Sequence, residues 1–151
     1  MQLADLMNTN VLSVGPDLAL EEVANRMVAN DTGAAAVVDE GKLVGVISER
    51  DLMRQLAAGW DGSLRVGDRM VRAVLTATPS TELPEAMAIM IDGHFRHLPI
   101  VSDDRVVGMV SMRDLMAWAS MRLRGTGTDD DDGLDTAELV ATINRFRTGA
   151  N

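Results

Sequence analysis

The chain has no cysteine among its 151 residues, and aromatic side chains make up only 3% of it. The absence of cysteine excludes disulfides, thiolate metal sites and cysteine nucleophiles. With so few aromatic residues the core must be aliphatic, and the apolar fraction of 46% and the 11 methionines can supply it. Only two histidines are present, both in one short segment, so nothing in the sequence calls for a metal.

Long hydrophobic runs are also missing. No apolar stretch approaches the roughly 18 residues that a membrane-spanning helix needs. The first ten residues, MQLADLMNTN, lack the basic region and the apolar region of a signal peptide. We therefore expect a cytoplasmic protein without a membrane partner.

Basic residues are scarce, with 14 Lys and Arg against 23 Asp and Glu and a formal net charge of −9. Residues 1–124 keep 17 acidic and 12 basic residues, which leaves a charge of −5 on the body of the chain. Nucleic-acid binding depends on neutralising phosphates with Lys and Arg, so this balance argues against it. An anionic ligand would have to be held by a few well-placed arginines and backbone amides.

What the sequence does contain is an internal repeat. Residues 5–53 align without a gap with residues 68–116, at an offset of 63 positions, and 16 of the 49 pairs are identical. The clearest match is GVISERDLM, from Gly45, against GMVSMRDLM, from Gly108. A repeat of this length indicates one small fold used twice.

The hydrophobic pattern predicts the same element order, β-α-β-β-α, in each repeat. The elements expected in the first repeat are a short strand at 11–14, a helix at 18–30, strands at 34–39 and 42–48, and a helix at 49–58. Those expected in the second are a short strand at 74–77, a helix at 83–93, strands at 97–102 and 105–111, and a helix at 112–124. Short helices are also possible at 3–7 and 66–70.

The fold class expected is therefore α/β (α+β), with two pseudo-symmetric units packed through their sheets. A unit of about 60 residues buries too little surface to be more than marginally stable alone. We therefore expect each copy to cover the other's sheet. The boundaries expected are 1–60 for repeat 1, 61–124 for repeat 2, and 125–151 for an acidic linker and a C-terminal amphipathic helix. That helix either docks on its own domain or a dimer mate, which we favour, or binds a partner.

The motif Ser48-x-x-Asp51 has two interpretations. It fits a capping box, in which the serine and the acid close the free amides at a helix start. It also fits an anion site, because a helix N-terminus offers amides and partial positive charge. Gly45 would let a backbone or a ligand approach the strand closely, and Arg50 near the helix start opposes the helix dipole unless an anion compensates. The same positions in the second repeat are Gly108, Ser111, Arg113 and Asp114.

The chemistry of this set suits a nucleotide. A carboxylate accepts hydrogen bonds from two ribose hydroxyls, a serine donates to phosphate oxygens, and an arginine forks onto them. A flat base would fit between aliphatic strand residues. No nucleophile–base pair, metal-ligand set or acid–base pair is placed by spacing, so we expect that the protein is not an enzyme.

These residues carry a family resemblance. The pieces GVISERD, RMVRAVLTATPSTELPEAMAIM and RHLPIVSDDRVVGMVSMRD, in this order, resemble a tandem pair of cystathionine-beta-synthase (CBS) domains, often called a Bateman module. The resemblance covers about residues 3–122. The motif alone is short, but its two copies at equal offset within the β-α-β-β-α pattern make the likeness specific.

The resemblance implies a regulatory module that binds an adenosine compound between the repeats and signals to an effector protein, commonly as a homodimer. AMP, ADP or ATP is the expected ligand, with S-adenosylmethionine or NAD as less favoured candidates. The implied site residues are the ribose-binding Asp51 and Asp114, the phosphate-facing Ser48 and Ser111 with Arg50 and Arg113 nearby, Ser13 and Thr76 at the starts of strands, and the base-bordering Leu98, Pro99 and Ile100.

The first repeat departs from the pattern, since Ala36 stands where the second has Pro99. We therefore expect the second site to be the better formed. Arg96 points either into the cleft or to solvent, and His94 and His97 suit the start of a strand or a phosphate contact better than a metal. The rival hypothesis is a ligand-free dimerisation or protein-interaction module, in which Ser-x-x-Asp only caps a helix.

Overall fold

The computed structural model describes residues 1–60 and 62–125, with side chains as far as residue 120. The expected C-terminal helix and the acidic run 129–132 lie outside the described residues. The elements are η1 (Leu3–Asp5), β1 (Ser13–Val14), α1 (Leu20–Ala29), β2 (Ala34–Asp39), β3 (Lys42–Ser48), α2 (Glu49–Ala57), α3 (Val66–Arg69), α4 (Leu83–Asp92), β4 (His97–Ser102), β5 (Arg105–Ser111) and α5 (Met112–Gly125).

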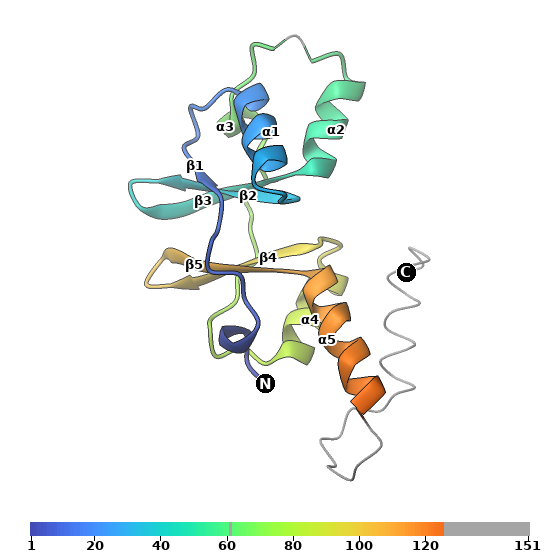
Figure 1. Ribbon diagram of the computed structural model, residues 1–151. Helices are drawn as coiled ribbons and strands as arrows, with labels where there is room; N and C mark the ends of the chain where they lie inside the picture. Colours follow the sequence, from blue (N-terminus) through green and yellow to red (C-terminus); the bar gives the residue numbers. More distant parts are fainter. Residues whose placement is uncertain (61, 126–151) are drawn as a thin grey trace.

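Two sheets lie face to face in the middle of the molecule, and helices cover their outer sides (Figure 1). The upper sheet has the order β1-β2-β3, with β1 parallel to β2 and β2 antiparallel to β3. The lower sheet is the antiparallel pair β4-β5. Helices α1, α2 and α3 cover the upper sheet, and α4 and α5 cover the lower one (Figure 1). This arrangement confirms the mixed α/β class and the packing of two repeats through their sheets.

The hairpins of the two repeats correspond closely. Each has a register shift at the same place, between Val37 and Val38 and between Ile100 and Val101. Each also turns through two left-handed residues, with φ of 47° and 80° at Glu40-Gly41 and 50° and 63° at Asp103-Asp104. Two successive positive φ values match the right-handed strand twist at a tight hairpin.

The first strand expected in the second repeat is reduced to one bridge, in which Ala77 pairs in parallel with Ile100. Proline explains the difference. In the first repeat the Ala36 amide donates to the Leu12 carbonyl at 2.9 Å. The equivalent position is Pro99, which has no N–H to donate, so this ladder bond cannot form.

Three apolar clusters stabilise the fold. One fills the space between the upper sheet and its helices, around Leu20, Val23 and Ile47. A second fills the corresponding space below, around Leu83, Leu98 and Leu115. The third lies between the two sheets, where Ala34, Ala36 and Met109 are buried. Trp118 is 6% exposed within the lower cluster, and Trp60 packs against the upper one.

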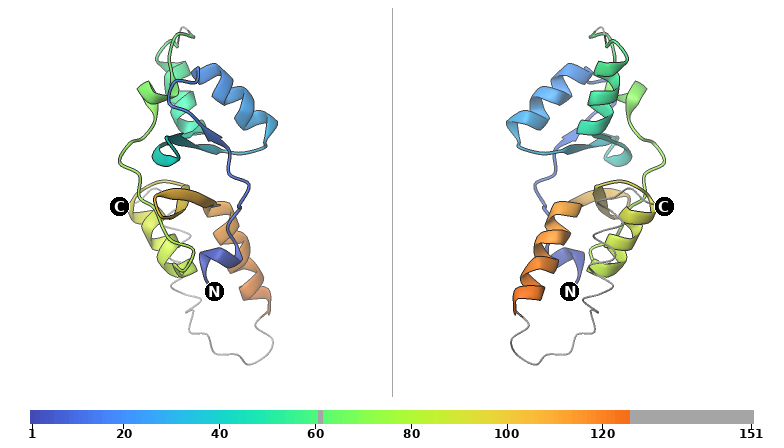
Figure 2. Two further views of the ribbon diagram at one scale, coloured as in Figure 1. Left: turned by 90° about the vertical axis from the view of Figure 1, so that its left-hand side faces the viewer. Right: turned by 90° about the vertical axis from the view of Figure 1, so that its right-hand side faces the viewer.

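The start of each repeat packs on the other repeat. Residues 1–8 lie on the lower unit, where the Leu3 amide donates to the Thr81 carbonyl at 2.9 Å and Leu3 is fully buried. Residues 64–72 lie on the upper unit, where the Val66 amide donates to the Leu18 carbonyl at 2.9 Å. Figure 2 shows the N-terminal turn beside α4 and α5, and α3 beside the upper helices. We call residues 1–8 and 64–72 the crossing segments.

Candidate functional site

Two clefts open between the repeats, one for each copy of the Ser-x-x-Asp motif. The first cleft, of about 310 Å³, is lined by Ser48, Arg50 and Asp51. The second cleft, of about 330 Å³, is lined by Ser111, Arg113 and Asp114. Their similar volumes follow from the pseudo-symmetry of the fold, although Ala36 replaces proline only in the first repeat.

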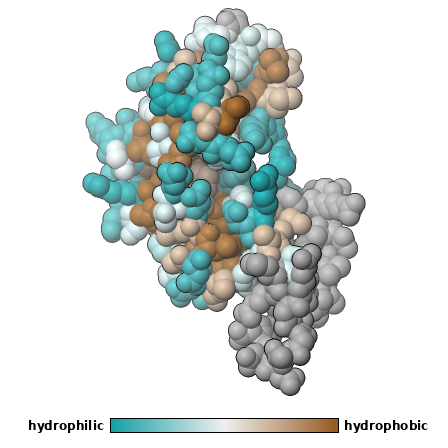
Figure 3. Space-filling model, in the orientation of Figure 1, coloured by the Kyte–Doolittle hydropathy of each residue, from teal (hydrophilic) through white to brown (hydrophobic). Residues whose placement is uncertain are grey.

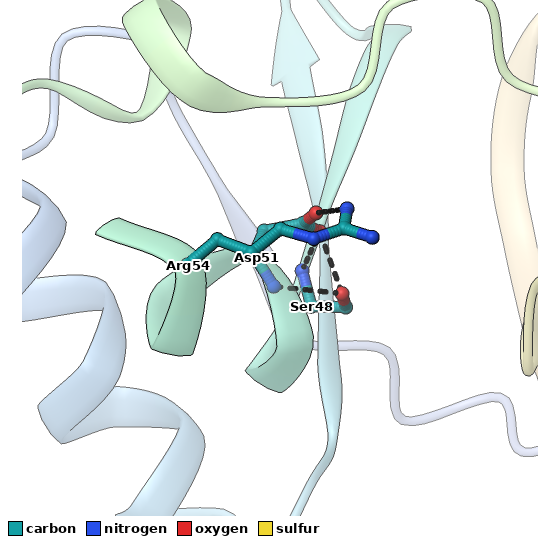
Figure 4. A network of polar contacts seen from close by, with 3 residues as sticks. All are labelled: Ser48, Asp51 and Arg54. Carbon is teal, nitrogen blue, oxygen red and sulfur yellow. Dashed lines mark hydrogen bonds and ion pairs between the residues drawn. The ribbon is translucent and has the colours of Figure 1, made fainter. Parts of the chain in front are cut away.

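The motif in the first cleft forms a reciprocal cap at the start of α2. The Ser48 amide donates to Asp51 Oδ2 at 2.9 Å, and the Asp51 amide faces Ser48 Oγ at 3.4 Å. The Ser48 hydroxyl also donates to Asp51 Oδ2 at 2.6 Å. The other carboxylate oxygen, Oδ1, lies 3.6 Å from Arg54 Nη1 (Figure 4).

The second copy repeats this geometry at the start of α5. The Ser111 amide and hydroxyl donate to Asp114 Oδ2 at 2.8 and 2.6 Å, and the Asp114 amide faces Ser111 Oγ at 3.2 Å. In both copies these bonds use the Oδ2 oxygen of the acid. Capping and ligand binding are therefore compatible, because Oδ1 can accept a further hydrogen bond while Oδ2 holds the helix start.

Four residues line both clefts and form a shared wall between them: Gly33, Glu49, Arg96 and His97. Arg96 lines both clefts and is also exposed to solvent, so its role in a ligand site stays a prediction. A Cβ atom on Gly33 would lie only 3.0 Å from His97 Cε1, so the imidazole packs directly against this glycine. The shared wall brings the two clefts into direct contact with the same side chains.

The surroundings of His97 in the shared wall shift its pKa. Burial, followed by the positive charge of Arg96, lowers the pKa of His97 below its ordinary value of 6.5. The carboxylates of Glu49 and Asp114 act in the opposite direction without cancelling the effect. The neutral imidazole is therefore the favoured form at pH 7, and it can donate or accept a hydrogen bond at the wall.

Several other predicted site residues lie away from the two clefts. Leu98 and Ile100 are fully buried in the lower apolar cluster, and Pro99 is buried in β4 opposite Met109. Thr76 lines a separate hollow with Lys42 and Asp104. Ser13 is exposed on β1, with its hydroxyl 3.5 Å from the Val11 carbonyl. Their proposed ligand contacts stay predictions.

Both clefts also contain residues that the sequence patterns did not single out. Residues near the start of each repeat line the cleft built by the other motif copy: Val71, Val74 and Leu75 in the first, and Asn8, Asn10, Val11 and Leu12 in the second. The two groups are related by the repeat offset of 63 residues. The offset was visible in the sequence, but the crossing that places these residues was not.

Apolar and polar sides can be distinguished in each cleft. Val46, Val74 and Leu75 offer aliphatic surface to a flat group in the first cleft, and Val11, Leu12 and Met109 do so in the second. The motif serine, arginine and aspartate lie on the polar side. In the described part of the chain, no group of three or more His, Asp or Glu side chains is placed to hold a metal ion. No described helix is long and apolar enough to cross a membrane.

Two similar repeats packed through their sheets, with a cleft of polar and apolar lining at each motif copy, define a class of tandem-repeat protein. The CBS domain model matches residues 3–58 and 66–120. The chain therefore belongs to the CBS domain family, as its resemblance predicted.

Relatives support this assignment. The chain is 35% identical over 112 residues to the CBS domain-containing protein YhcV of Bacillus subtilis, covering 74% of this chain and 80% of that protein. It is similar, at 31% identity and a TM-score of 0.66, to the cytosolic domain of the Mg²⁺ channel MgtE solved in complex with ATP, covering 78% of this chain and 48% of that one. The CBS domain pair of protein MJ0100, solved with 5′-methylthioadenosine and S-adenosyl-L-methionine, shares the fold at 24% identity and a TM-score of 0.76. The match covers 81% of this chain and 98% of that one.

Proposed function

We propose that this protein is a non-catalytic sensor, which binds an adenosine compound between its repeats and passes the signal to a partner protein. The observation that carries the proposal is the composition of the clefts. Each combines a Ser-x-x-Asp helix start with aliphatic residues from the start of the other repeat. A ribose phosphate and a flat base need these two kinds of surface side by side.

Each motif residue has a role in the proposal. The Oδ1 oxygens of Asp51 and Asp114 accept hydrogen bonds from ribose hydroxyls, and Arg50 and Arg113 are placed to pair with a phosphate group in a cleft whose ligand carries one. The related structures with ATP and with S-adenosyl-L-methionine support an adenosine ligand as the class to test. Ser13, Thr76 and the strand residues 98–100 would then act only through the backbone that they position.

Signalling requires the ligand to bind one arrangement of the two repeats better than another. A ligand between the sheets contacts both units and so can bias their relative position. A homodimer is the form that the family resemblance leads us to expect. Exposed apolar side chains on the upper helices, Val28 at 83%, Met53 at 63% and Leu56 at 62%, are candidates for that contact. Figure 3 shows apolar surface in the region of α2 (upper right).

The test is a thermal-shift and calorimetric titration of the full chain with AMP, ATP, S-adenosylmethionine and NAD. A ligand that binds only the folded state stabilises it by about 2.7 kcal/mol at a hundredfold excess over its dissociation constant. We expect at least one adenosine compound to raise the melting temperature.

The matched variants are Asp114→Asn and Asp114→Ala. Asparagine keeps one oxygen for the amide bonds of the cap but removes the second carboxylate oxygen, so we expect Asp114→Asn to weaken ligand binding in the second cleft with little loss of stability. Alanine removes both functions. If no adenosine compound stabilises the protein and Asp114→Ala only unfolds it, then the proposal fails.

That outcome would favour the second candidate, a ligand-free interaction module. The specific observation in its favour is the complete cap at both motifs, which accounts for Ser48-x-x-Asp51 and Ser111-x-x-Asp114 without a ligand.

A further inference from the structure

We propose that the two clefts select different adenosine compounds by charge. The first cleft takes a nucleotide with a charged phosphate chain, and the second takes an adenosine compound that lacks phosphate groups. The inference rests on the proposed function and goes beyond it, because it assigns a ligand class to each cleft separately.

The charged side chains that line the clefts differ. Three arginines and two carboxylates line the first cleft: Arg50, Arg54, Arg96, Glu49 and Asp51. Two arginines and three carboxylates line the second: Arg96, Arg113, Asp31, Glu49 and Asp114. With histidines counted as neutral, the formal charge is +1 in the first cleft and −1 in the second.

The difference comes from two positions, since the shared wall contributes equally to both clefts. Asp31 lines the second cleft, and the residue at the equivalent repeat position, His94, lines the first. Both have left-handed backbone conformations, with φ of 48° and 56°, in the turn that follows the first long helix of the repeat. The same backbone turn therefore presents an acid to one cleft and an imidazole to the other.

The second position is Arg54, whose equivalent in the second repeat is Ala117. Arg54 lies one turn into α2, with its Nη1 atom 3.6 Å from Asp51 Oδ1 and a side chain that is 67% exposed. An exposed guanidinium at this distance is held weakly and can turn toward a phosphate chain beside Ser48. The second cleft has only an alanine at this place.

The ends that receive the base do not differ in this way. Aliphatic side chains line both clefts, with Val74 and Leu75 in the first and Val11 and Leu12 in the second. The repeat offset relates Val74 to Val11 and Leu75 to Leu12, so both positions carry the same residue type in the two clefts. Both clefts can therefore accept the same base, and discrimination falls on the group attached to the ribose.

The experiment is isothermal titration of the full chain with ATP and with adenosine at one fixed ionic strength. We expect one ATP to bind per chain and adenosine still to bind to the ATP-saturated protein. Asp51→Asn should remove ATP binding and leave that of adenosine, whereas Asp114→Asn should keep ATP binding and remove the adenosine that binds to the ATP-saturated protein.

Two charge variants test the cause. Arg54→Ala should weaken ATP binding about tenfold or more and leave adenosine binding unchanged. Asp31→Asn should create a second ATP site or tighten a weak one about tenfold, and asparagine tolerates the left-handed conformation at this position. Glu21→Gln is the matched control, because it removes one exposed acid on α1, outside both clefts, and should leave ATP stoichiometry unchanged.

The inference is overturned if ATP fills both clefts of the unaltered protein equally, or if Asp31→Asn behaves as Glu21→Gln does. Those results would leave the proposed function intact, because adenosine compounds would still bind. If neither ATP nor adenosine binds, this inference fails, and the proposed function fails with it only if AMP, S-adenosylmethionine and NAD do not bind either.

Discussion

The pKa of His97 depends on how the two repeats pack against each other. His97 is half-buried at the start of β4, against Gly33 of the other repeat, and it lies beside the charged Arg96. Burial and Arg96 lower its pKa below 6.5 in the folded protein. The unfolded chain has no such surroundings, so the two states bind protons differently at mildly acidic pH.

Stability should therefore depend on pH through His97. As pH falls below 6.5, the unfolded state takes up a proton at this imidazole before the folded state does, so the free energy of unfolding falls. The contribution is fully present above 6.5 and is lost as pH falls through the folded pKa. Urea unfolding at pH 7.5 and 5.5 should show a larger loss for the unaltered protein than for His97→Gln. Equal losses would contradict this assignment, since the carboxylates are common to both proteins.

At the scale of elements, strands β3 and β5 each pack against a crossing segment. This packing explains the glycine in each copy of the motif. A Cβ atom on Gly45 of β3 would lie 2.5 Å from Met70 Sδ and 3.0 Å from the Val71 carbonyl oxygen. A Cβ atom on Gly108 of β5 would lie 2.5 Å from Met7 Sδ. The sequence predicted that these glycines permit a close approach, and the structure identifies the approaching group as the crossing segment.

Gly45→Ala should destabilise the protein by about 1–3 kcal/mol, as overpacking usually does. A double-mutant cycle with Met70→Ala locates the cause. If the clash is with Met70, then the second substitution should cost less in the Gly45→Ala background than in the unaltered protein. Gly15→Ala is the control, because nothing lies within 4 Å of the position that its Cβ atom would take. Additive losses from Gly45→Ala and Met70→Ala would rule out this contact.

Across the molecule as a whole, the crossing segments tie the two units together. Leu3 belongs to the first repeat in the sequence but is buried in the lower core with Leu83 and Leu115. Val66 precedes the second repeat's aligned segment but is buried in the upper core with Leu20. The core of each unit therefore contains a residue from the crossing segment that leads into the other repeat.

Leu3→Ala should cost about 2–5 kcal/mol, the usual range for a buried leucine. Its effect should appear first in the lower unit, where hydrogen exchange of the β4 and β5 amides should speed up. Val66→Ala should instead act on β2 and β3, with a smaller cost because valine has fewer buried atoms. Faster exchange in the upper sheet after Leu3→Ala would contradict the crossed packing.

The elements and the symmetry of this protein follow from its sequence alone. The 63-residue offset, the alternating apolar runs and the glycine and proline breaks are local patterns, and the observed bounds Ala34–Asp39 and His97–Ser102 match the expected strands. The Ser-x-x-Asp pairs were visible too, because a cap is formed by residues three positions apart. The missing strand at 74–77 was harder to foresee, since it depends on which strand Pro99 faces.

The construction of the clefts, by contrast, depends on long-range packing. No local pattern shows that residues 1–8 pack on the lower unit, because that contact depends on which of two similar cores receives Leu3. Nor could spacing place Asp31, Arg54 and Arg96, since each of them reaches its cleft through the packing of separate elements. The repeat makes the two clefts alike in volume, and the positions of Asp31 and Arg54, where the repeats differ, give them unlike charge.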